Sequence, residues 1–268
     1  MKDTCTTVSI IMGVRYRRSD TTALLRAAAS ILRQSFRDFE FLICDDGSSA
    51  QAATLLEQLA LSDPRIRLIR PGDKLSLAPK LNACLREARG RYIARMDDDD
   101  VSLPERLQKQ IHCLEEHLEF GFVGSNVFLK KNGVRCGERI FPETPQIKDF
   151  YMTQPFIHPT LVFRREALEA AGGYSEGERQ VLCEDYDLLL RLYGCGYRGM
   201  NLQETLFEYT IPATAKGNRT MRHRVNEVVT RWERFRDLGL FPAALPFVIK
   251  PMVVGLLPER ILTAVKYR

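Results

Sequence analysis

Residues 92–100 read YIARMDDDD, an apolar segment followed at once by four aspartates. The apolar part predicts a buried strand, and the aspartates begin where that strand ends. Adjacent carboxylates repel one another and raise one another's pKa unless a cation neutralises them. The stretch therefore places a candidate cation site at the end of a strand.

A second acidic cluster follows another apolar segment earlier in the chain. Residues 39–44 read FEFLIC and predict a strand, and residues 45–48 (DDGS) come directly after it. Strands are expected at 8–12, 39–44, 66–69, 92–96 and 120–129, and helices at 21–34, 50–61, 77–89 and 102–117. This alternation predicts an α/β fold, a mostly parallel sheet flanked by helices, in which ligands bind at the carboxyl ends of the strands.

The second half of the chain has a less regular pattern. A loop is expected at 130–146, strands at 157–163 and 197–210, and helices at 164–171, 185–193 and 220–238.

Each of the two acidic clusters has two interpretations. Mg²⁺ and Mn²⁺ prefer hard oxygen ligands, and Mg²⁺ commonly joins one or two carboxylates to substrate phosphates, so a metal–diphosphate site is one interpretation. In the other, Asp100 and Ser102 cap the next helix and residues 45–48 form an Asx turn. The position of both clusters at strand ends favours the ligand site.

Two further motifs have a structural and a functional interpretation. Glu184-Asp185-Tyr186-Asp187 opens a predicted helix, where acids are favoured by the helix dipole, but a carboxylate there also suits a general base. His158 precedes a proline and is either a residue at the edge of a strand or a ligand contact.

Taken in order, these motifs resemble those of the family 2 glycosyltransferases, inverting enzymes with the GT-A fold. The resemblance covers most of residues 7–210 and depends on the order and spacing of short segments. The segments are VSIIM (8–12), SILRQSFRDFE (30–40), DDGS (45–48), LNA (81–83), ARMDDDD (94–100), LPERL (103–107), HPT (158–160), GGY (172–174) and EDYDL (184–188).

The resemblance implies a nucleotide-sugar donor, usually a UDP-sugar, and Mn²⁺ or Mg²⁺ as cofactor. Asp97–Asp99 matches the DxD motif, so Asp99 and Asp97 would ligate the metal that bridges the phosphates and stabilises the departing UDP. Asp185 aligns with the catalytic base, with Glu184 beside it. Contacts to the nucleotide-sugar are implied for Arg15, Tyr16, Asp45, Asp46, Asn82, Asp97, Asp98 and His158.

The chain departs from the family pattern after the last predicted strand. Relatives often carry Tyr-Arg-x-His there, whereas residues 209–212 read YTIP. Lys216, Arg219 or His223 would have to replace the missing histidine.

A second departure concerns the QxxRW motif of processive relatives. Val228 stands at the glutamine position before Arg231 and Trp232, which indicates a non-processive enzyme. Trp232 falls on an amphipathic helix and is expected to pack in the core.

The net charge of +5 is unevenly distributed: residues 209–268 carry +7 and the first 208 residues carry −2. Residues 240–258 contain one charged residue, Lys250, and four prolines, which exclude one straight membrane-spanning helix. This tail is expected either to lie on an anionic membrane surface, or to pack on the catalytic domain or in a homodimer contact.

The composition also bears on the compartment. The seven cysteines form no CxxC pair, so neither a zinc site nor a disulfide framework is expected, and a reducing cytoplasm fits. Neither a long apolar stretch nor a signal peptide is recognisable. The basic tail carries no nucleic-acid-binding motif, so nucleic acid is not an expected partner.

The sequence thus predicts a catalytic domain at 1–215, with a nucleotide-sugar half near 1–128 and an acceptor half near 129–215, and a helical basic tail at 216–268. The expected activity is non-processive transfer of a sugar to a hydroxyl of a glycan or polyprenyl-linked glycan, as in surface polysaccharide assembly, on the cytoplasmic side of a membrane. Two alternatives are a sugar-phosphate nucleotidyltransferase, which normally has a glycine-rich phosphate loop that is absent here, and a non-catalytic nucleotide-sugar-binding protein.

Overall fold

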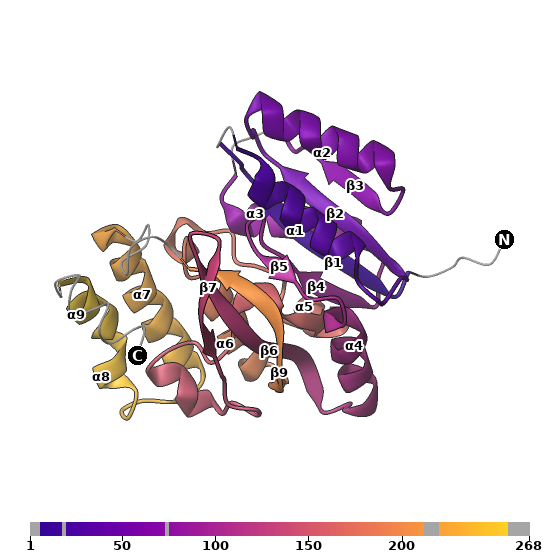
Figure 1. Ribbon diagram of the computed structural model, residues 1–268. Coiled ribbons are helices and arrows are strands. Elements are labelled where there is room, and N and C mark those ends of the chain that lie inside the picture. Colours follow the sequence, from indigo (N-terminus) through magenta and orange to yellow (C-terminus); the bar gives the residue numbers. More distant parts are fainter. Residues whose placement is uncertain (1–5, 18–19, 73–74, 212–219, 257–268) are drawn as a thin grey trace.

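The computed structural model describes residues 6–17, 20–72, 75–211 and 220–256. Its strands are β1 (Val8–Val14), β2 (Phe39–Asp45), β3 (Ile66–Ile69), β4 (Tyr92–Arg95), β5 (Val101–Ser102), β6 (Phe120–Lys131), β7 (Val134–Arg139), β8 (Val162–Arg164) and β9 (Arg198–Thr210). Its α-helices are α1 (Thr22–Leu32), α2 (Ala50–Ser62), α3 (Leu77–Glu87), α4 (Arg106–Glu116), α5 (Arg165–Ala170), α6 (Glu184–Gly194), α7 (Met221–Asp237), α8 (Leu245–Val248) and α9 (Lys250–Leu256). Three 3₁₀ turns are η1 (Ile147–Tyr151), η2 (His158–Thr160) and η3 (Glu178–Gln180). The strands join into a sheet flanked by helices, which confirms the predicted α/β fold (Figure 1).

The first half of the sheet is parallel, in the order β3-β2-β1-β4. Alternate side chains point to opposite faces, so Ile10 and Phe41 join one core cluster and Ile11 and Leu42 join another. Helices α1 and α2 contribute to the first cluster and α3 to the second. Cover on both faces explains why these strands are largely apolar, with Ser9, Glu40 and Arg95 as buried exceptions.

The second half of the sheet is mixed. β8 lies between β4 and β6 and is antiparallel to both, while β6 and β9 pair in parallel over most of their length. The far end of β9 pairs with β5, directly after the four aspartates. One continuous sheet therefore connects the first half of the chain to the second.

The predicted loop at 130–146 is wrong for its first part. β6 extends to Lys131, and a two-residue turn, Asn132-Gly133, leads into β7, which pairs back on β6. Both turn residues have positive φ, 50° for Asn132 and 82° for Gly133, as a tight hairpin turn of this kind requires. The Asn-Gly pair was the sequence signal for this hairpin.

The predicted strand at 157–163 is wrong for its first part as well. His158–Thr160 forms the turn η2, in which the amides of Thr160 and Leu161 donate to the carbonyls of Ile157 and His158. Pro159 has no amide hydrogen to give to a sheet, so the chain turns here and pairs only from Val162 onward.

The last helices pack against α6 and the residue before it. The α7 side chain Arg234 bonds Asp187 of α6 at 2.8 Å, and Thr230 contacts Cys183 at 3.4 Å. Helices α8 and α9 then return along α7 (Figure 1). In the parts of the chain that the structure describes, no helix is both long and apolar enough to span a bilayer.

Candidate active site

Both acidic clusters lie at the same edge of the sheet. The register of β1 pairs Val14 with Asp45 on β2 and Ile11 with Arg95 on β4, so the parallel strands end together. Asp45 and Asp46 follow β2, and Asp97–Asp100 follow β4. The sequence correctly anticipated that these carboxylates share one edge.

Asp46 is buried and surrounded by cationic groups. One carboxylate oxygen accepts a hydrogen bond from the Leu75 amide, and the other lies 3.5 Å from Lys80 Nζ and 3.9 Å from Arg15 Nε. Lys80 is itself buried and donates to the Val14 carbonyl at 3.1 Å. Lys80 was not expected at this site from the sequence, because a lysine on a helix usually lies on the surface.

Asp45 holds the turn that follows β2. Its carboxylate accepts the Ser48 amide at 3.1 Å, which is the Asx-type bond of the structural interpretation. The Tyr16 amide in turn donates to the Ser48 hydroxyl at 2.8 Å. The Tyr16 ring is buried in the core, so the backbone of Tyr16, rather than its phenol, supports this turn.

The four aspartates differ in their surroundings. A terminal guanidinium nitrogen of Arg95 donates to Asp97 Oδ1 at 2.6 Å. Asp100 is fully buried and accepts the Thr210 amide at 2.7 Å, and burial followed by the charges of Asp97 and Asp99 raises its pKa well above the usual range. Burial and the same two neighbours raise the pKa of Asp98 to about 7.

The structural interpretation of these aspartates as a helix cap is wrong. α4 begins four residues later than the predicted cap, at Arg106, and the side chain that caps its first turn is that of Gln34, whose Oε1 accepts the Leu107 amide at 3.0 Å. Ser102 instead contacts Gln34 at 3.0 Å, and Asp100 is bound to β9. Asp100 thereby anchors the loop, which leaves Asp97 to Asp99 as the partly exposed acids.

Glu184 and Asp185 form the first turn of α6. Asp185 Oδ1 accepts the Tyr186 amide at 2.8 Å, and Oδ2 accepts the side-chain amide of Gln154 at 3.0 Å. Glu184 is only 6% exposed, and its Oε2 has no hydrogen-bond partner among the described residues. Burial, and then the charge of Asp185, raises the pKa of Glu184 to about 7.

Tyr174 connects the two halves of the site. Its hydroxyl lies 2.8 Å from His158 Nε2, and its backbone bonds the side chain of Asn82 through both N–H and C=O, at 2.9 and 2.7 Å. The phenol lies near enough to Asp97 and Asp185 for both charges to act on its pKa. Asn82 and His158 thus hold Tyr174 close to acids from two elements, the loop after β4 and the start of α6.

His158 is uncharged in this environment. It is buried, and burial followed by the nearby Arg95 holds its pKa well below the usual range. A neutral imidazole can share a hydrogen bond with the Tyr174 hydroxyl, which orients both rings.

A small cleft of about 200 Å³ opens between the start of α3 and the segment before α6. Its walls include Ser76, Leu77, Gly177, Leu182 and Glu184. The cleft thus separates Glu184 from the start of α3.

These carboxylates suit a metal ion that takes its remaining ligands from the substrate. Within the described ranges, no three His, Cys, Asp or Glu side chains converge as a metal cage. Asp99 and the second oxygen of Asp97 offer the one or two carboxylates with which Mg²⁺ usually joins substrate phosphates. Of the proposed substitutes for the missing histidine, His223 bonds Thr220 at the start of α7, and Lys216 and Arg219 lie outside the described residues.

Comparison with known proteins adds a family and a fold. The family model described as "Glycosyl transferase family 2" matches residues 9–172. The chain is 35% identical over 257 residues to "Putative glycosyltransferase EpsE" of Bacillus subtilis, covering 95% of this chain and 91% of that protein.

It is also 29% identical over 202 residues to "UDP-Glc:alpha-D-GlcNAc-diphosphoundecaprenol beta-1,3-glucosyltransferase WfaP" of Escherichia coli, covering 75% of this chain and 76% of that protein. Among solved structures, the mannosyltransferase PcManGT of Pyrobaculum calidifontis, in complex with GDP-Man and Mn²⁺, superposes with a TM-score of 0.63 at 17% identity. That alignment covers 97% of this chain and 79% of the other.

Proposed function

The chain belongs to glycosyl transferase family 2, and on this basis we propose that it is an inverting, non-processive glycosyltransferase. It transfers a sugar from a nucleotide-sugar, in our proposal a UDP-sugar, to a hydroxyl of a glycan or polyprenyl-linked glycan. The relative WfaP supports this choice, since its name specifies a UDP-sugar donor and a lipid-linked acceptor. The reaction fits a step in the assembly of a surface polysaccharide at the cytoplasmic face of a membrane.

The observation that carries the proposal is the arrangement of acids around Tyr174. Asp97, which follows β4, and Asp185 and Glu184, which begin α6, all lie near enough to the Tyr174 phenol for their charges to act on its pKa. A donor diphosphate bound at the β4 edge therefore has its sugar next to the start of α6. That position is where an acceptor hydroxyl needs a base.

In the proposed reaction Asp185 accepts the proton of the acceptor hydroxyl as its oxygen attacks the anomeric carbon. A bond forms between that carbon and the acceptor oxygen, and the bond to the diphosphate oxygen breaks with its electron pair on the nucleotide. Attack from the side opposite the leaving group inverts the anomeric carbon. Gln154 orients Asp185 by its hydrogen bond to Oδ2.

Asp99 and Asp97 would hold Mn²⁺ or Mg²⁺, with Arg95 fixing the orientation of Asp97. Such a metal supplies Lewis-acid stabilisation of the departing diphosphate. Asp98, with its neighbours, faces the ribose in this proposal.

The turn after β2 would bind the base and ribose. Asp45 and Asp46 lie there with Arg15 and Lys80, a set that offers both acceptors and donors to the edge of a pyrimidine. Asn82 and His158 act in this scheme by positioning Tyr174.

The test is a donor-hydrolysis screen without acceptor, using UDP-, GDP- and dTDP-sugars with Mn²⁺ and an EDTA control. Slow, EDTA-sensitive release of nucleotide from one donor is expected. Asp185→Asn should lower transfer to acceptor by about 10²- to 10⁴-fold, the usual contribution of a general base, while binding of UDP stays close to the wild-type value.

Glu115→Gln is the control, because this exposed side chain on α4 lies outside the site. Equal turnover in Asp185→Asn and the wild type would refute the role of Asp185. If no donor is turned over without acceptor, titration of UDP with and without Mn²⁺ decides: metal-dependent UDP binding keeps the transferase proposal, and its absence supports the non-catalytic alternative.

A further inference from the structure

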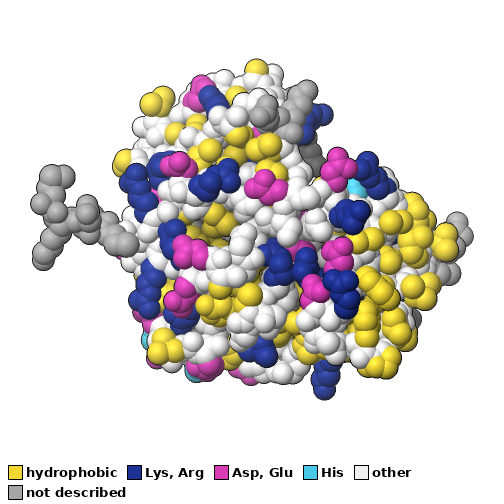
Figure 2. Space-filling model, turned by 180° about the vertical axis from the view of Figure 1, so that it is seen from behind, with side chains coloured by type: hydrophobic (Ala, Val, Ile, Leu, Met, Phe, Trp, Pro, Cys, Tyr) yellow, Lys and Arg dark blue, Asp and Glu magenta, His cyan; other side chains and the backbone are white. Residues whose placement is uncertain are grey.

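An apolar surface extends over the last three helices. Fourteen large hydrophobic residues are exposed in the described part of the chain, and half of them lie between 221 and 256. They are Met221, Val225, Trp232, Leu245, Ile249, Val253 and Leu256, which we call the α7–α9 face. Figure 2 shows this face as a nearly continuous area of apolar side chains. Soluble proteins rarely leave so many apolar residues together without a partner.

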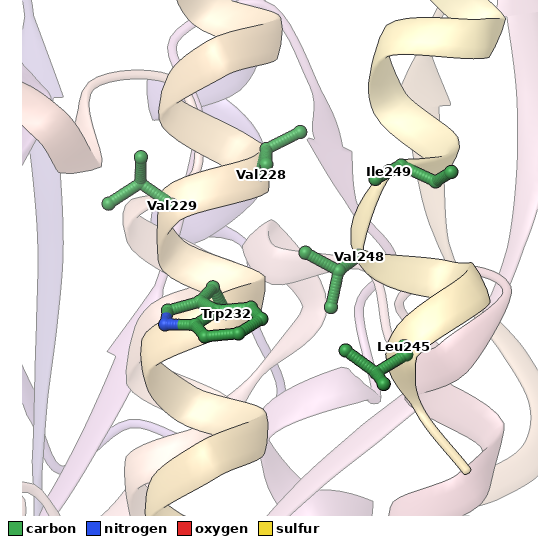
Figure 3. A pocket seen from close by; sticks show the side chains of 6 residues that line it. All are labelled: Val228, Val229, Trp232, Leu245, Val248 and Ile249. Atoms are coloured by element: carbon green, nitrogen blue, oxygen red, sulfur yellow. The ribbon is translucent and has the colours of Figure 1, made fainter. Parts of the chain in front are cut away.

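A groove of about 300 Å³ lies within this face. Six apolar residues from α7, α8 and the residue before α9 line it: Val228, Val229, Trp232, Leu245, Val248 and Ile249. In Figure 3 the Trp232 ring on α7 points toward Val248 and Leu245 on the facing helix. The Trp232 ring contacts the Phe241 ring in a tilted arrangement, with 4.9 Å between the ring centroids. Trp232 nevertheless remains 46% exposed, so it packs against the protein in part and does not lie in the core as expected.

Charge indicates what covers this face. The described residues 220–256 include six basic and three acidic side chains, and the sequence from 209 to the end carries +7 against −2 for the rest. Two copies meeting at this face would bring two strongly positive tails together, which costs free energy. An anionic surface complements both the apolar groove and the charge.

The face lies next to the acceptor end of the site. On α7, Arg222 pairs with Glu178 of η3 at 2.8 Å, and Asn226 donates to the Glu178 carbonyl at 3.0 Å. Thr230 contacts Cys183, the residue before Glu184. Helix α7, which carries part of this face, therefore also packs against the segment that leads into Glu184 and Asp185.

We propose that the α7–α9 face docks on an anionic lipid bilayer, with the Trp232 groove taking up hydrocarbon of that surface. The docking itself stands apart from the proposed function. Its link to catalysis, that a lipid-linked acceptor reaches Asp185 from the bilayer, depends on that function.

Trp232 is the only tryptophan of the chain, so its fluorescence reports on this face without any substitution. Vesicles of phosphatidylcholine with phosphatidylglycerol should shift its emission to shorter wavelength, and vesicles with brominated acyl chains should quench it. Pure phosphatidylcholine vesicles should bind more weakly, and added salt should weaken the binding to anionic vesicles. Unchanged emission and no co-sedimentation with anionic vesicles at low salt would overturn the proposal.

A pair of double variants tests the face itself. Ile249→Ser with Val253→Ser removes two exposed apolar side chains of the face and should lower partition onto anionic vesicles by about tenfold or more. The control, Leu61→Ser with Leu118→Ser, removes two leucines on α2 and after α4 that are more exposed than Ile249 and Val253, and it should leave partition unchanged.

Two outcomes of these experiments would contradict the proposal that a lipid bilayer covers this face. Equal partition of both double variants would show that binding does not use the α7–α9 face. A shift of Trp232 emission with protein concentration in the absence of lipid, matched by a dimer in light scattering, would assign the face to a second copy. Donor hydrolysis should be wild-type in both double variants, so loss of vesicle binding and failure of the glycosyltransferase proposal are separate results.

Discussion

The buried side chain of Arg95 helps to stabilise the four neighbouring aspartates at the edge of the sheet. It is almost fully buried and donates to Asp97, so a positive charge lies beneath the four aspartates. A second buried guanidinium, Arg106, lies behind it and donates to the Arg95 carbonyl at 2.9 Å. Burial and the charge of Arg95 lower the pKa of Arg106 to about 9. The two arginines offset part of the negative charge of these carboxylates.

Glu184 gives a prediction for pH dependence. Its pKa rises from 4.5 to about 7 on folding, so between these values the folded protein keeps a proton that the unfolded chain has lost. The free energy of unfolding therefore falls as pH rises through this window, by about 3 kcal/mol in full. Glu184→Gln lacks this ionisation, so its stability relative to wild type should increase by about 2 to 3 kcal/mol between pH 5 and pH 8, measured by urea unfolding.

Glu115→Gln serves again as the control, because an exposed side chain should show the same difference from wild type at both pH values. A Glu184→Gln difference that does not change with pH would show that Glu184 ionises freely in the folded protein.

At the scale of elements, the turn between α3 and β4 depends on one glycine. The Gly90 amide donates to Ser9 Oγ at 2.7 Å, and the same hydroxyl donates to Glu40 at 2.7 Å. A Cβ on Gly90 would lie 2.4 Å from the Ser9 nitrogen, far inside contact distance with backbone that cannot rotate away. The connection that starts β4, and with it the position of the aspartates, therefore requires glycine.

Gly90→Ala should lower the free energy of unfolding by about 2 kcal/mol or more, through displaced backbone and a weakened Ser9–Glu40 network. Thermal or urea unfolding measures this loss. Gly137→Ala is the matched control, since a Cβ there meets Leu129 at 3.9 Å, an ordinary contact, and a change within about 0.5 kcal/mol is expected. Equal stability of the two variants would contradict the close approach at Gly90.

The sequence anticipated the elements whose periodicity is strong. β1, β2 and β3 and the helices between them appear close to the expected residues, because each buries a whole face or a whole strand. It missed β7, where charged residues alternate on an exposed hairpin, and β5, whose two residues carry no periodicity. It also gave no sign that β8 enters the sheet antiparallel, since strand direction depends on long-range pairing.

The candidate site was anticipated in the same uneven way. The sequence predicts acids at strand ends, because an apolar segment is followed directly by a run of aspartates. The partners of those acids are not predicted, since Lys80 on α3 and Thr210 on β9 reach them only after folding. Tyr174 is part of the GGY motif at 172–174. Its contacts with Asn82 and His158, which fix its position in the site, could not be predicted from that motif.

At the scale of the whole molecule, ligand binding should stabilise the folded chain. If Asp97 and Asp99 bind Mn²⁺ together with a nucleoside diphosphate, UDP with Mn²⁺ at about 100 times the dissociation constant adds about 2.7 kcal/mol. For a chain of this size that raises the melting temperature by about 5 to 10 °C, which differential scanning fluorimetry detects.

EDTA should remove most of this increase, and so should Asp99→Asn, whose melting temperature without ligand should stay near that of the wild type. An equal shift by UDP with and without Mn²⁺ would contradict the assignment of the metal to Asp97 and Asp99.

The continuity of the sheet has a consequence for exchanging parts between relatives. β4 pairs with β8 and β5 pairs with β9, so strands from before and after residue 128 lie side by side. A chimera joined near 128 would cut β6 and would also have to match the pairs of β6 with β8 and β9 and the contact that holds Asp100 against Thr210. A chimera joined between Ile211 and Thr220 keeps every described strand pair within one parent and transfers α7, α8 and α9 as a unit. Such a chimera would exchange the proposed lipid-binding face between relatives without changing the proposed catalytic site.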